Sequence, residues 1–481
     1  MGNAKKGAGK VCAADAGGED MRQRGLARLG RGAVAAVVLL GLSGTASGQW
    51  GVGGIGGVFG SDDPGGMPPS RIAFRPWVSA NGSYSQVLGA QSIPGLRRDF
   101  YGYGASAGLS GARGWERTSV AGFYTANYQR WTGEGVRGGA SHVGGVTVSH
   151  RATGRVSVFA TQFAGSSLGG FGFGAPAGIF GGFGIAGSAL LPSAGLLGTP
   201  VSDLASNGLV DNELFSSRVH FYGTSGGVNF RPGLRWSLGG GAHANFVRRK
   251  GAGLRDLNSY GVFGQAGYQP GQNTQIGFSY GYSEFSYPKL FGDNRAQFAG
   301  VGLEHRLSPQ TSVSLSGGVF RMDTKFLGAV QTDPAIAALL GVSSQIEVQK
   351  RSFYGWQGSA AIHRNWREWG VSAGYTHGLN PGNGAILASR RDAVFGSAGR
   401  SIGRFSMGTF GGYYRWSGLL QNTTLTSGSV GASTGFRMVG ELHLGFNGGY
   451  SYFDTAGSAR RWQRFVSAHL TWSPSGAAFR F

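Results

Sequence analysis

The chain is poor in three things: cysteine, charge and long hydrophobic runs. Its only cysteine is Cys12, so disulfide staples and thiolate metal sites are excluded for the rest of the chain. Charged residues make up 14% of the 481 residues, against about 25% in ordinary soluble domains. After residue 48 no apolar run approaches the roughly 20 residues that a membrane-spanning helix needs. Low charge without such runs excludes a helical membrane protein and favours alternating strands.

Glycine is abundant, with 93 residues, and short segments show strict alternation. Successive side chains of a strand point to opposite faces. In segment 274–286 one face would carry Ile276, Phe278, Tyr280 and Tyr282, and the other Gln275, Gly277, Ser279, Gly281 and Ser283. Segment 259–269 alternates in the same way, and the Pro-Gly turn at 270–273 predicts that the two form an antiparallel hairpin.

From residue 73 onward the alternation predicts an all-β chain of eighteen strands, with sixteen as the alternative count. The ranges are 74–87, 100–111, 117–131, 139–151, 155–164, 216–230, 235–248, 259–269, 274–286, 295–307, 311–322, 350–363, 367–378, 390–400, 403–416, 425–437, 440–453 and 462–472. Segments of this length match the roughly 10 residues with which a tilted strand crosses a bilayer.

The links between the predicted strands alternate in length. After even-numbered strands they are short turns, such as those at 153–154 and 232–233, whereas after odd-numbered strands they are mostly long, as at 88–99, 165–215 and 323–349. A soluble β-sandwich has no reason to sort its turns in this way. A transmembrane antiparallel β-barrel has short periplasmic turns and long extracellular loops, so the pattern predicts a barrel at 73–481.

Residues 21–48 have the three parts of a secretory signal peptide. A positive segment from Met21 to Arg31 precedes an apolar segment from Ala33 to Leu42 and the small residues Ala46-Ser47-Gly48. The alternative, a membrane anchor, would need a longer apolar run. Met21 is a better start than Met1, so we interpret residues 1–20 as a mis-assigned extension. Residues 49–72 are a Gly/Pro-rich linker ahead of the barrel.

Signal peptide, alternation, sorted turns and the terminal aromatic residue together resemble the Gram-negative outer-membrane β-barrel class, porins in particular, over residues 73–481; no specific family is assigned. The resemblance implies a location in the cell outer membrane, with outer-membrane lipid and the barrel-assembly machinery as partners. Proteins of this class usually end the last strand with an aromatic residue that the machinery reads. Phe479 and Phe481 are the candidate C-terminal assembly signal.

Five even-numbered strands end in an arginine directly preceded by histidine or phenylalanine. These arginines are Arg151, Arg231, Arg306, Arg364 and Arg437. In a barrel they would share the periplasmic rim, where an arginine side chain can reach lipid phosphate or bond to turn carbonyls. Repeat ancestry of the hairpins explains the same pattern equally well, and the sequence leaves both interpretations open.

The sequence gives little support for an enzyme, a metal site or a nucleic-acid-binding protein. A hydrolase needs a nucleophile, a base and an orienting partner close together, yet acids are scarce on the strands, and His363 and His377 fall near opposite ends of adjacent strands. There is no His-x-x-x-His pair or EF-hand loop, and the G-x-G-x-x-G match at 51–56 follows no strand. Basic residues are spread rather than clustered with aromatics. We expect no enzyme, no cofactor and no nucleic-acid partner; the oligomeric state is not indicated.

Loop 165–215 is unusual because no residue from Val156 to Ser202 is charged. It is the third long loop, the one that folds into the lumen in many porins. Three interpretations stay open: an inward constriction, an apolar patch that meets membrane or a partner, and a flexible glycine-rich surface loop.

The expected function follows from the charge and from the predicted lumen. Residues 1–48 hold 7 of the 43 basic and 3 of the 22 acidic residues, so the mature chain has a net charge of +17. The lumen-facing residues would be small and polar, among them Ser279, Ser283, Asn245 and His243. These features predict a porin-like channel for small hydrophilic solutes with a mild anion preference. The alternatives are a structural or adhesive barrel with a closed lumen and, further off, an embedded lipid-modifying enzyme.

Deleting Phe479 to Phe481 should lower the amount of barrel in outer membranes, because the last strand is expected to continue past Pro474 to the chain end. Electrophoresis of unboiled and boiled membranes would measure the heat-modifiable barrel. Assembly at the normal level would instead mean that the strand stops at Trp472, that 473–481 is a periplasmic tail and that Trp472 is the signal.

Overall fold

A computed structural model of the chain describes residues 73–88, 99–132, 138–168, 218–250, 256–288, 292–331, 344–382, 387–419, 423–439, 441–455 and 461–473. All of them belong to one of two compact units, Thr45–Phe481. The predicted extension at 1–20, signal peptide at 21–48, linker at 49–72 and assembly signal at Phe479 and Phe481 lie outside these residues, as does most of loop 165–215. None of the described segments is a helix with the length and hydrophobicity needed to cross a membrane.

Eighteen β-strands make up the described chain. They are β1 (Ala73–Leu88), β2 (Asp99–Gly114), β3 (Thr118–Thr132), β4 (Gly139–Arg151), β5 (Val156–Leu168), β6 (Arg218–Phe230), β7 (Trp236–Lys250), β8 (Leu257–Gly271), β9 (Thr274–Ser286), β10 (Asp293–Ser308), β11 (Thr311–Gln331), β12 (Ser344–Asn365), β13 (Trp369–Gly382), β14 (Leu387–Ile402), β15 (Phe405–Gly418), β16 (Thr424–Arg437), β17 (Leu442–Thr455) and β18 (Arg461–Trp472).

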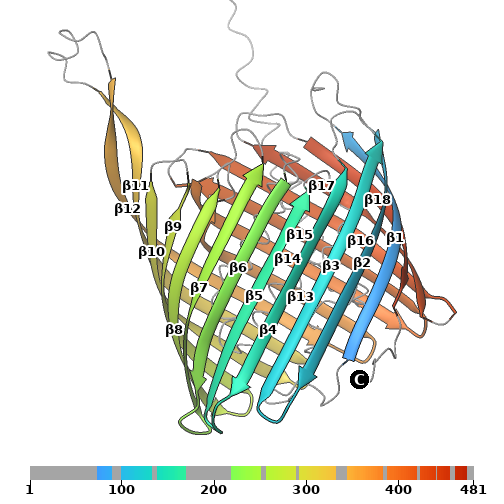
Figure 1. Cartoon of the computed structure of the whole chain (residues 1–481), viewed down its shortest axis with the longest axis horizontal. Helices are drawn as coiled ribbons and strands as arrows, with labels where there is room; N and C mark the ends of the chain where they lie inside the picture. The colour runs from blue at the N-terminus through green and yellow to red at the C-terminus, as the bar shows by residue number, and fades with distance from the viewer. Residues whose placement is uncertain are drawn as a thin grey trace, which may run out of the picture. The chain divides into compact units, whose positions relative to one another are not determined.

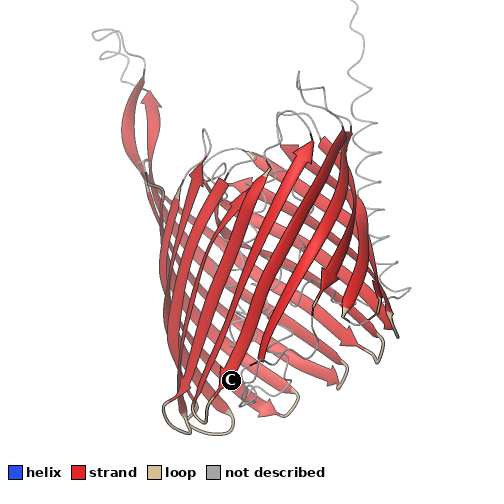
Figure 2. Cartoon of the chain, turned by 45° about the vertical axis from the view of Figure 1, so that its right-hand side comes forward, coloured by secondary structure: helices blue, strands red, loops and turns tan. Residues whose placement is uncertain are grey.

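The strands form one closed antiparallel sheet. Each strand pairs with its neighbours in sequence, and β1 also pairs with β18, from Val78 opposite Trp472 to Leu88 opposite Trp462. Figures 1 and 2 show the resulting barrel of tilted strands. The prediction of an eighteen-stranded antiparallel barrel is confirmed, and the alternative of sixteen is wrong. Closure removes the two edges that an open sheet would expose.

Short turns follow the even-numbered strands from β2 to β16, so they all lie at one end of the barrel, here called the turn end; the other is the loop end. The hairpin predicted at 270–273 forms with Gln272 and Asn273 at its tip. Pro270 lies where the register shifts between Tyr268 and Gly271, as expected of a residue that has no N–H for the ladder. Gly403 begins the turn between β14 and β15 with φ of 56°, a conformation that glycine adopts without a steric penalty.

Hydrogen bonds between neighbouring turns reinforce the turn end. They join the end of an even-numbered strand to the residue just before the preceding odd-numbered strand, and so extend each ladder by one pair. The bonds are donated by the backbone amides of Arg151, Arg231, Gln269, Arg306, Asn365, Ser401, Arg437 and Ser473 to the carbonyls of Arg117, Arg155, Arg235, Asn273, Gln310, Glu368, Arg404 and Glu441, respectively. The turns from β2 to β18 are thereby tied into a continuous rim.

The long loop predicted at 323–349 is wrong in its bounds. β11 continues to Gln331 and β12 begins at Ser344, with unbroken pairing between them. On one face of β11 the side chains change from apolar to charged at Arg321, Asp323 and Lys325, which ends the apolar alternation by which strands are recognised. The hairpin extends past its neighbours at the loop end (Figures 1 and 2).

Burial distinguishes the two faces of the barrel wall. In β9 the exposed fractions of Phe278 and Tyr280 are 53% and 54%, whereas that of Ser283, on the other parity, is 2%. Side chains directly opposite each other across a ladder share a face, so the register carries this assignment around the barrel. The outward face is apolar and aromatic through its middle, with exposed side chains such as Val78, Tyr128, Val262, Val301, Val319, Trp356, Val430 and Val466.

Phe278→Arg should impair barrel assembly, whereas Ser279→Arg should be tolerated. Phe278 lies on the outward face, where arginine near the bilayer midplane costs roughly 2–4 kcal/mol, and Ser279 lies on the inner face. The fraction of heat-modifiable barrel in reconstituted membranes measures the difference. The opposite ranking would mean that the faces are exchanged, as happens when a register slips by one residue.

Candidate functional site

The inner face of the barrel is the candidate functional site, and it holds the four predicted lumen residues. Ser279, Ser283, Asn245 and His243 lie on this face within three adjacent strands, β7 to β9. Asn245 is directly opposite Ser259, and both are 1% exposed. Within the described part of the chain, the Asn245 amide and the Ser259 hydroxyl have no hydrogen-bond partner. Such groups need water or a polar solute as partner, because leaving them unsatisfied is costly.

The inner face also carries phenylalanine, which the expectation of a small polar lining did not include. Each ring lies beside a glycine of a neighbouring strand, in the space that a β-carbon would occupy. The pairs are Phe263 with Gly241, Phe298 with Gly281, Phe320 with Gly355, Phe395 with Gly374 and Phe410 with Gly431. The glycines therefore let aromatic rings lie against the wall. No alternation pattern reveals this, because the two members of a pair belong to different strands.

Arginine dominates the charge of the inner face near the loop end. Arg249, Arg351 and Arg391 have the inner parity there. The guanidinium of Arg351 lies 5.0 Å from the ring centre of Phe353, and that of Arg391 lies 5.3 Å from the ring centre of Tyr414. Cations over aromatic faces are held in place by the ring quadrupole.

Acids are scarce on the inner face. Among the described strand residues with side chains placed, those of inner parity are Glu304 on β10 and Glu347 on β12. Glu284 has the parity of Phe278 and Tyr280, so it faces outward, where it pairs with Arg295 at 3.9 Å. The interior is therefore more positive than negative, in line with the composition of the whole chain.

An apolar cluster lines the inner wall near the loop end. Its buried members are Val219, Val247, Leu257, Phe285, Tyr287, Ala296 and Met322, and Phe221, Phe353, Leu379 and Leu419 pack against them. The cluster draws on β6 through β13 and on the residue after β15. Hydrophobic side chains from adjacent strands therefore pack together at this level.

The five predicted rim arginines all lie at the turn end. Four of them donate a backbone N–H to a carbonyl of an adjacent turn, at N–O distances of 2.6–2.8 Å; these are Arg151, Arg231, Arg306 and Arg437. Arg364 has the outward parity, and its guanidinium lies 4.2 Å from the ring centre of Trp366. Four of the five arginines therefore stand at positions where backbone hydrogen bonds join neighbouring turns.

The histidine that precedes the arginine also has a structural role in two hairpins. His150 Nδ1 is hydrogen-bonded to the hydroxyl of Thr118 at 2.8 Å, and His305 Nδ1 to the hydroxyl of Thr274 at 2.8 Å. In both cases the threonine begins the preceding strand and is the cross-strand partner of the histidine. The pair thus closes the hairpin at the turn end.

A histidine–aspartate pair that the sequence did not reveal lies on the outward face. His377 Nδ1 is 2.7 Å from Asp392 Oδ1, the Tyr375 hydroxyl donates to the same oxygen at 3.0 Å, and the His377 ring stacks on Trp356 with centres 3.9 Å apart. Among the described residues no serine or threonine hydroxyl bonds to His377. His363 has the opposite parity and lies five pairs away.

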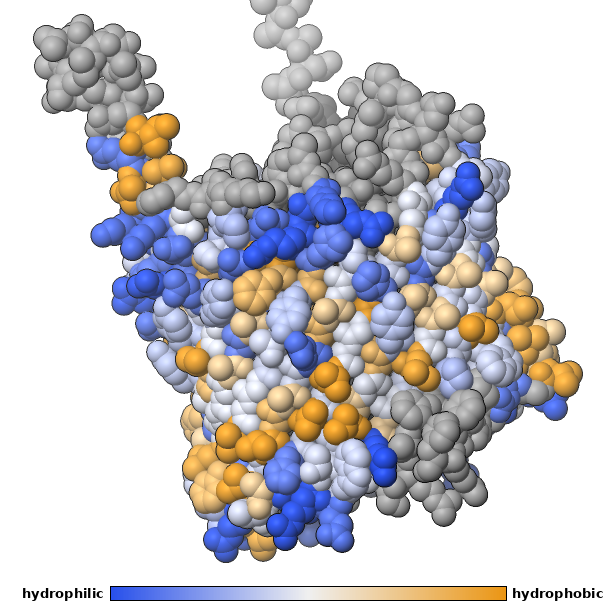
Figure 3. Space-filling model, in the orientation of Figure 1, coloured by the Kyte–Doolittle hydropathy of each residue, from blue (hydrophilic) through white to orange (hydrophobic). Residues whose placement is uncertain are grey.

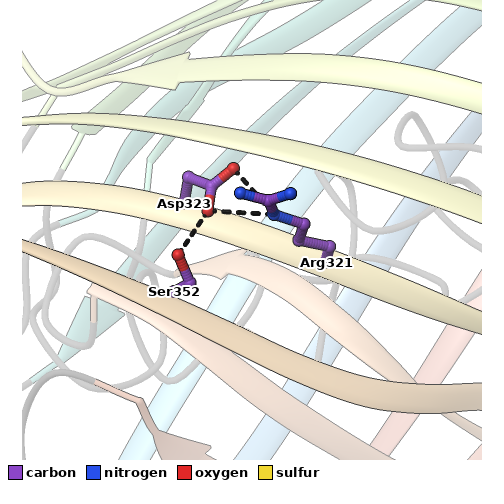
Figure 4. A network of polar contacts seen from close by, with 3 residues as sticks. All are labelled: Arg321, Asp323 and Ser352. Atoms are coloured by element: carbon purple, nitrogen blue, oxygen red, sulfur yellow. Dashed lines mark hydrogen bonds and ion pairs between the residues drawn. The ribbon is translucent and has the colours of Figure 1, made fainter.

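A second outward network joins β11 and β12 near the loop end (Figure 4). Arg321 Nε is 3.1 Å from the Asp323 carboxylate, and the Ser352 hydroxyl donates to that carboxylate at 2.6 Å. The Arg321 guanidinium also lies 5.8 Å from the ring centre of Tyr354. In the parts of the chain that the structure describes, no group of three His, Cys, Asp or Glu residues is placed to hold a metal ion.

Three comparisons relate the chain to known proteins. No protein-family model and no curated protein matches it. Solved barrels do match. The outer membrane protein OpdK of Pseudomonas aeruginosa is 11% identical, with 83% of this chain and 99% of that chain covered and a TM-score of 0.41. OccK9 (OpdG) of the same organism is 10% identical, with 83% and 98% covered and a TM-score of 0.40. The FrpB iron transporter of Neisseria meningitidis is 8% identical, with 82% and 81% covered and a TM-score of 0.38.

The class of protein rests on this chain's own features. A closed sheet of eighteen antiparallel strands, an apolar outward face and turns sorted by length define a transmembrane β-barrel of the outer-membrane class. By the same rule the turn end is periplasmic and the loop end is extracellular.

Gly281→Val should destabilise the barrel, whereas Gly317→Val should not. A β-carbon at Gly281 would overlap the ring of Phe298, whereas one at Gly317 would meet nothing within 4 Å. Overpacking typically costs about 1–3 kcal/mol. Urea titration of the barrel in lipid vesicles, followed by tryptophan fluorescence, measures the change. Equal midpoints for the two variants would contradict the ring-over-glycine arrangement.

Proposed function

We propose that the protein is an outer-membrane channel for the passive passage of small hydrophilic solutes, with a mild preference for anions. The observation that carries this proposal is the charge of the inner face, where Arg249, Arg351 and Arg391 are set against few acids. A positive lumen raises the local concentration of anions and lowers that of cations.

The size of the barrel supports a passage. Barrels of 16 to 18 strands leave an aqueous channel, and this sheet has eighteen strands. Buried polar groups without protein partners, such as the Asn245 amide, favour water in the interior. Export by the signal peptide at 21–48, folding by the barrel-assembly machinery and residence in outer-membrane lipid complete the proposal.

The second candidate is a structural or adhesive barrel whose lumen is closed. The apolar cluster at the loop end favours it, because Phe353, Leu379 and Leu419 pack against the buried residues of β6 to β11 there. In such a protein the loops and the extended β11–β12 hairpin would carry the function. An embedded lipid-modifying enzyme is a weaker candidate, since no serine or threonine hydroxyl among the described residues bonds to His377.

Single-channel recording in planar bilayers tests the first candidate against the second. The proposed channel should conduct, and under a potassium chloride gradient its reversal potential should give chloride a permeability at least equal to that of potassium. Absence of conductance from correctly folded protein would favour the closed barrel, and clear cation preference would contradict the role of the inner arginines.

Arg351→Gln with Arg391→Gln should lower the chloride-to-potassium permeability ratio, because it removes two positive charges from the inner face. The matched control is Lys350→Gln with Arg390→Gln, which removes the same charge from the adjacent positions of opposite parity. The control should leave the ratio unchanged, because outward charges are separated from the lumen by the barrel wall. Equal shifts in both variants would show that the selectivity does not arise in the lumen.

A further inference from the structure

The outward face of β6 and β7 carries a cluster of basic side chains at the loop end, here called the basic sector. It consists of Arg218, His220, Arg248 and Lys250. Arg218 is directly opposite Lys250, and His220 is directly opposite Arg248. Arg218 and Lys250 are like charges in directly opposed positions, which destabilises a sheet. This pair, with Arg248 beside it, favours the binding of an anion that compensates for the repulsion.

The direction of these side chains follows from the burial of β7. Val247 and Arg249 are 4% and 8% exposed, whereas Arg248 and Lys250 between and after them are exposed. Arg248 and Lys250 share their face of β7 with Trp236 and Leu238, the exposed residues at the start of the strand. This is the outward face. The basic sector therefore faces the surroundings of the barrel and not its lumen.

Carboxylates neutralise two other outward arginines at the loop end but not the cations of the basic sector. Arg295 pairs with Glu284, and Arg321 pairs with Asp323. Among the described residues no carboxylate forms an ion pair with Arg218, Arg248 or Lys250. The nearby Asp256 accepts the backbone amide of Arg249 at 2.8 Å, and Arg218 donates only to the Ser166 hydroxyl, at 3.3 Å.

Aromatic side chains lie directly below the basic sector, toward the middle of the wall. The Phe246 ring is 6.1 Å from that of Tyr222 and 5.6 Å from that of Tyr260, and the Arg248 guanidinium is 5.9 Å from the Phe246 ring centre. Figure 3 shows hydrophilic side chains along the upper ends of β5 to β7 and hydrophobic ones lower on the same face. At a membrane interface, basic side chains attract anionic lipid headgroups, and aromatic rings lie at the level of those headgroups. The arrangement therefore suits a lipid with an anionic headgroup.

We propose that the basic sector binds the phosphate groups of a phosphorylated glycolipid of the outer leaflet. Arginine binds phosphate through paired N–H donors, and lysine adds a point charge. The acyl chains of the same molecule would lie over Tyr222, Phe246 and Tyr260. The proposal rests on the outer-membrane class, which puts the loop end in the outer leaflet, and does not depend on whether the lumen conducts.

The wild-type barrel, purified in detergent, should bind diphosphorylated lipid A more tightly than its dephosphorylated form, as measured by native mass spectrometry. Arg218→Gln with Lys250→Gln should weaken binding of the diphosphorylated form by roughly thirtyfold. Each basic residue near an anionic membrane surface contributes about 1 kcal/mol to the binding free energy, and two such residues are removed. Equal binding of the two lipids by the wild type would overturn the proposal without any variant.

The matched control is Arg295→Gln with Arg321→Gln, which removes two outward charges that already have carboxylate partners. It should change lipid A binding by less than threefold, and both variants should keep the heat-modifiable mobility of a folded barrel. An equal loss in the two variants, displacement by millimolar inorganic phosphate, or equal affinity for phosphatidylglycerol would each overturn the assignment, the last two in favour of a free-anion or general lipid site.

Discussion

Every backbone N–H and C=O group of a strand in lipid must find its partner within the protein, because hydrocarbon offers none. Pairing of β1 with β18 meets this constraint, since it joins the first strand to the last across the whole length of the described ladder. The fixed order of neighbours, the even number of strands and the sorting of turns to one end all follow from a ring closed in this way. The bonds between turns continue the same pairing into the rim.

A closed wall then separates two environments, and each residue of a strand belongs to one of them. The outward parity is apolar and aromatic, as at Phe278 and Tyr280. The inner parity mixes small polar residues with phenylalanine rings that lie against glycines of the next strand. Glycine is abundant partly for this reason. On the inner face a glycine of one strand makes room for an aromatic ring of the neighbouring strand.

Charge is sorted by the same wall. Inner arginines near the loop end lie over aromatic rings, and outward charges gather where the strands leave the apolar zone. Some outward cations there have a carboxylate partner, as in the Arg321–Asp323–Ser352 network. The sector of β6 and β7 brings Arg218, Arg248 and Lys250 together without such a partner among the described residues, and it is there that we propose an anion binds from outside.

The sequence by itself determined the strand count, the face to which Phe278 or Ser279 belongs and the end at which each turn lies, because alternation and turn chemistry are local along one strand or one hairpin. It failed for 323–331 of β11 and 344–349 of β12, where charged side chains interrupt the apolar alternation although the backbone pairing continues. Only the tertiary structure decided that Phe298 lies over Gly281, that His377 meets Asp392 and that Arg218 is opposite Lys250. Each of these contacts depends on the register between two strands, and register is set by the whole ring of ladders and not by either segment alone.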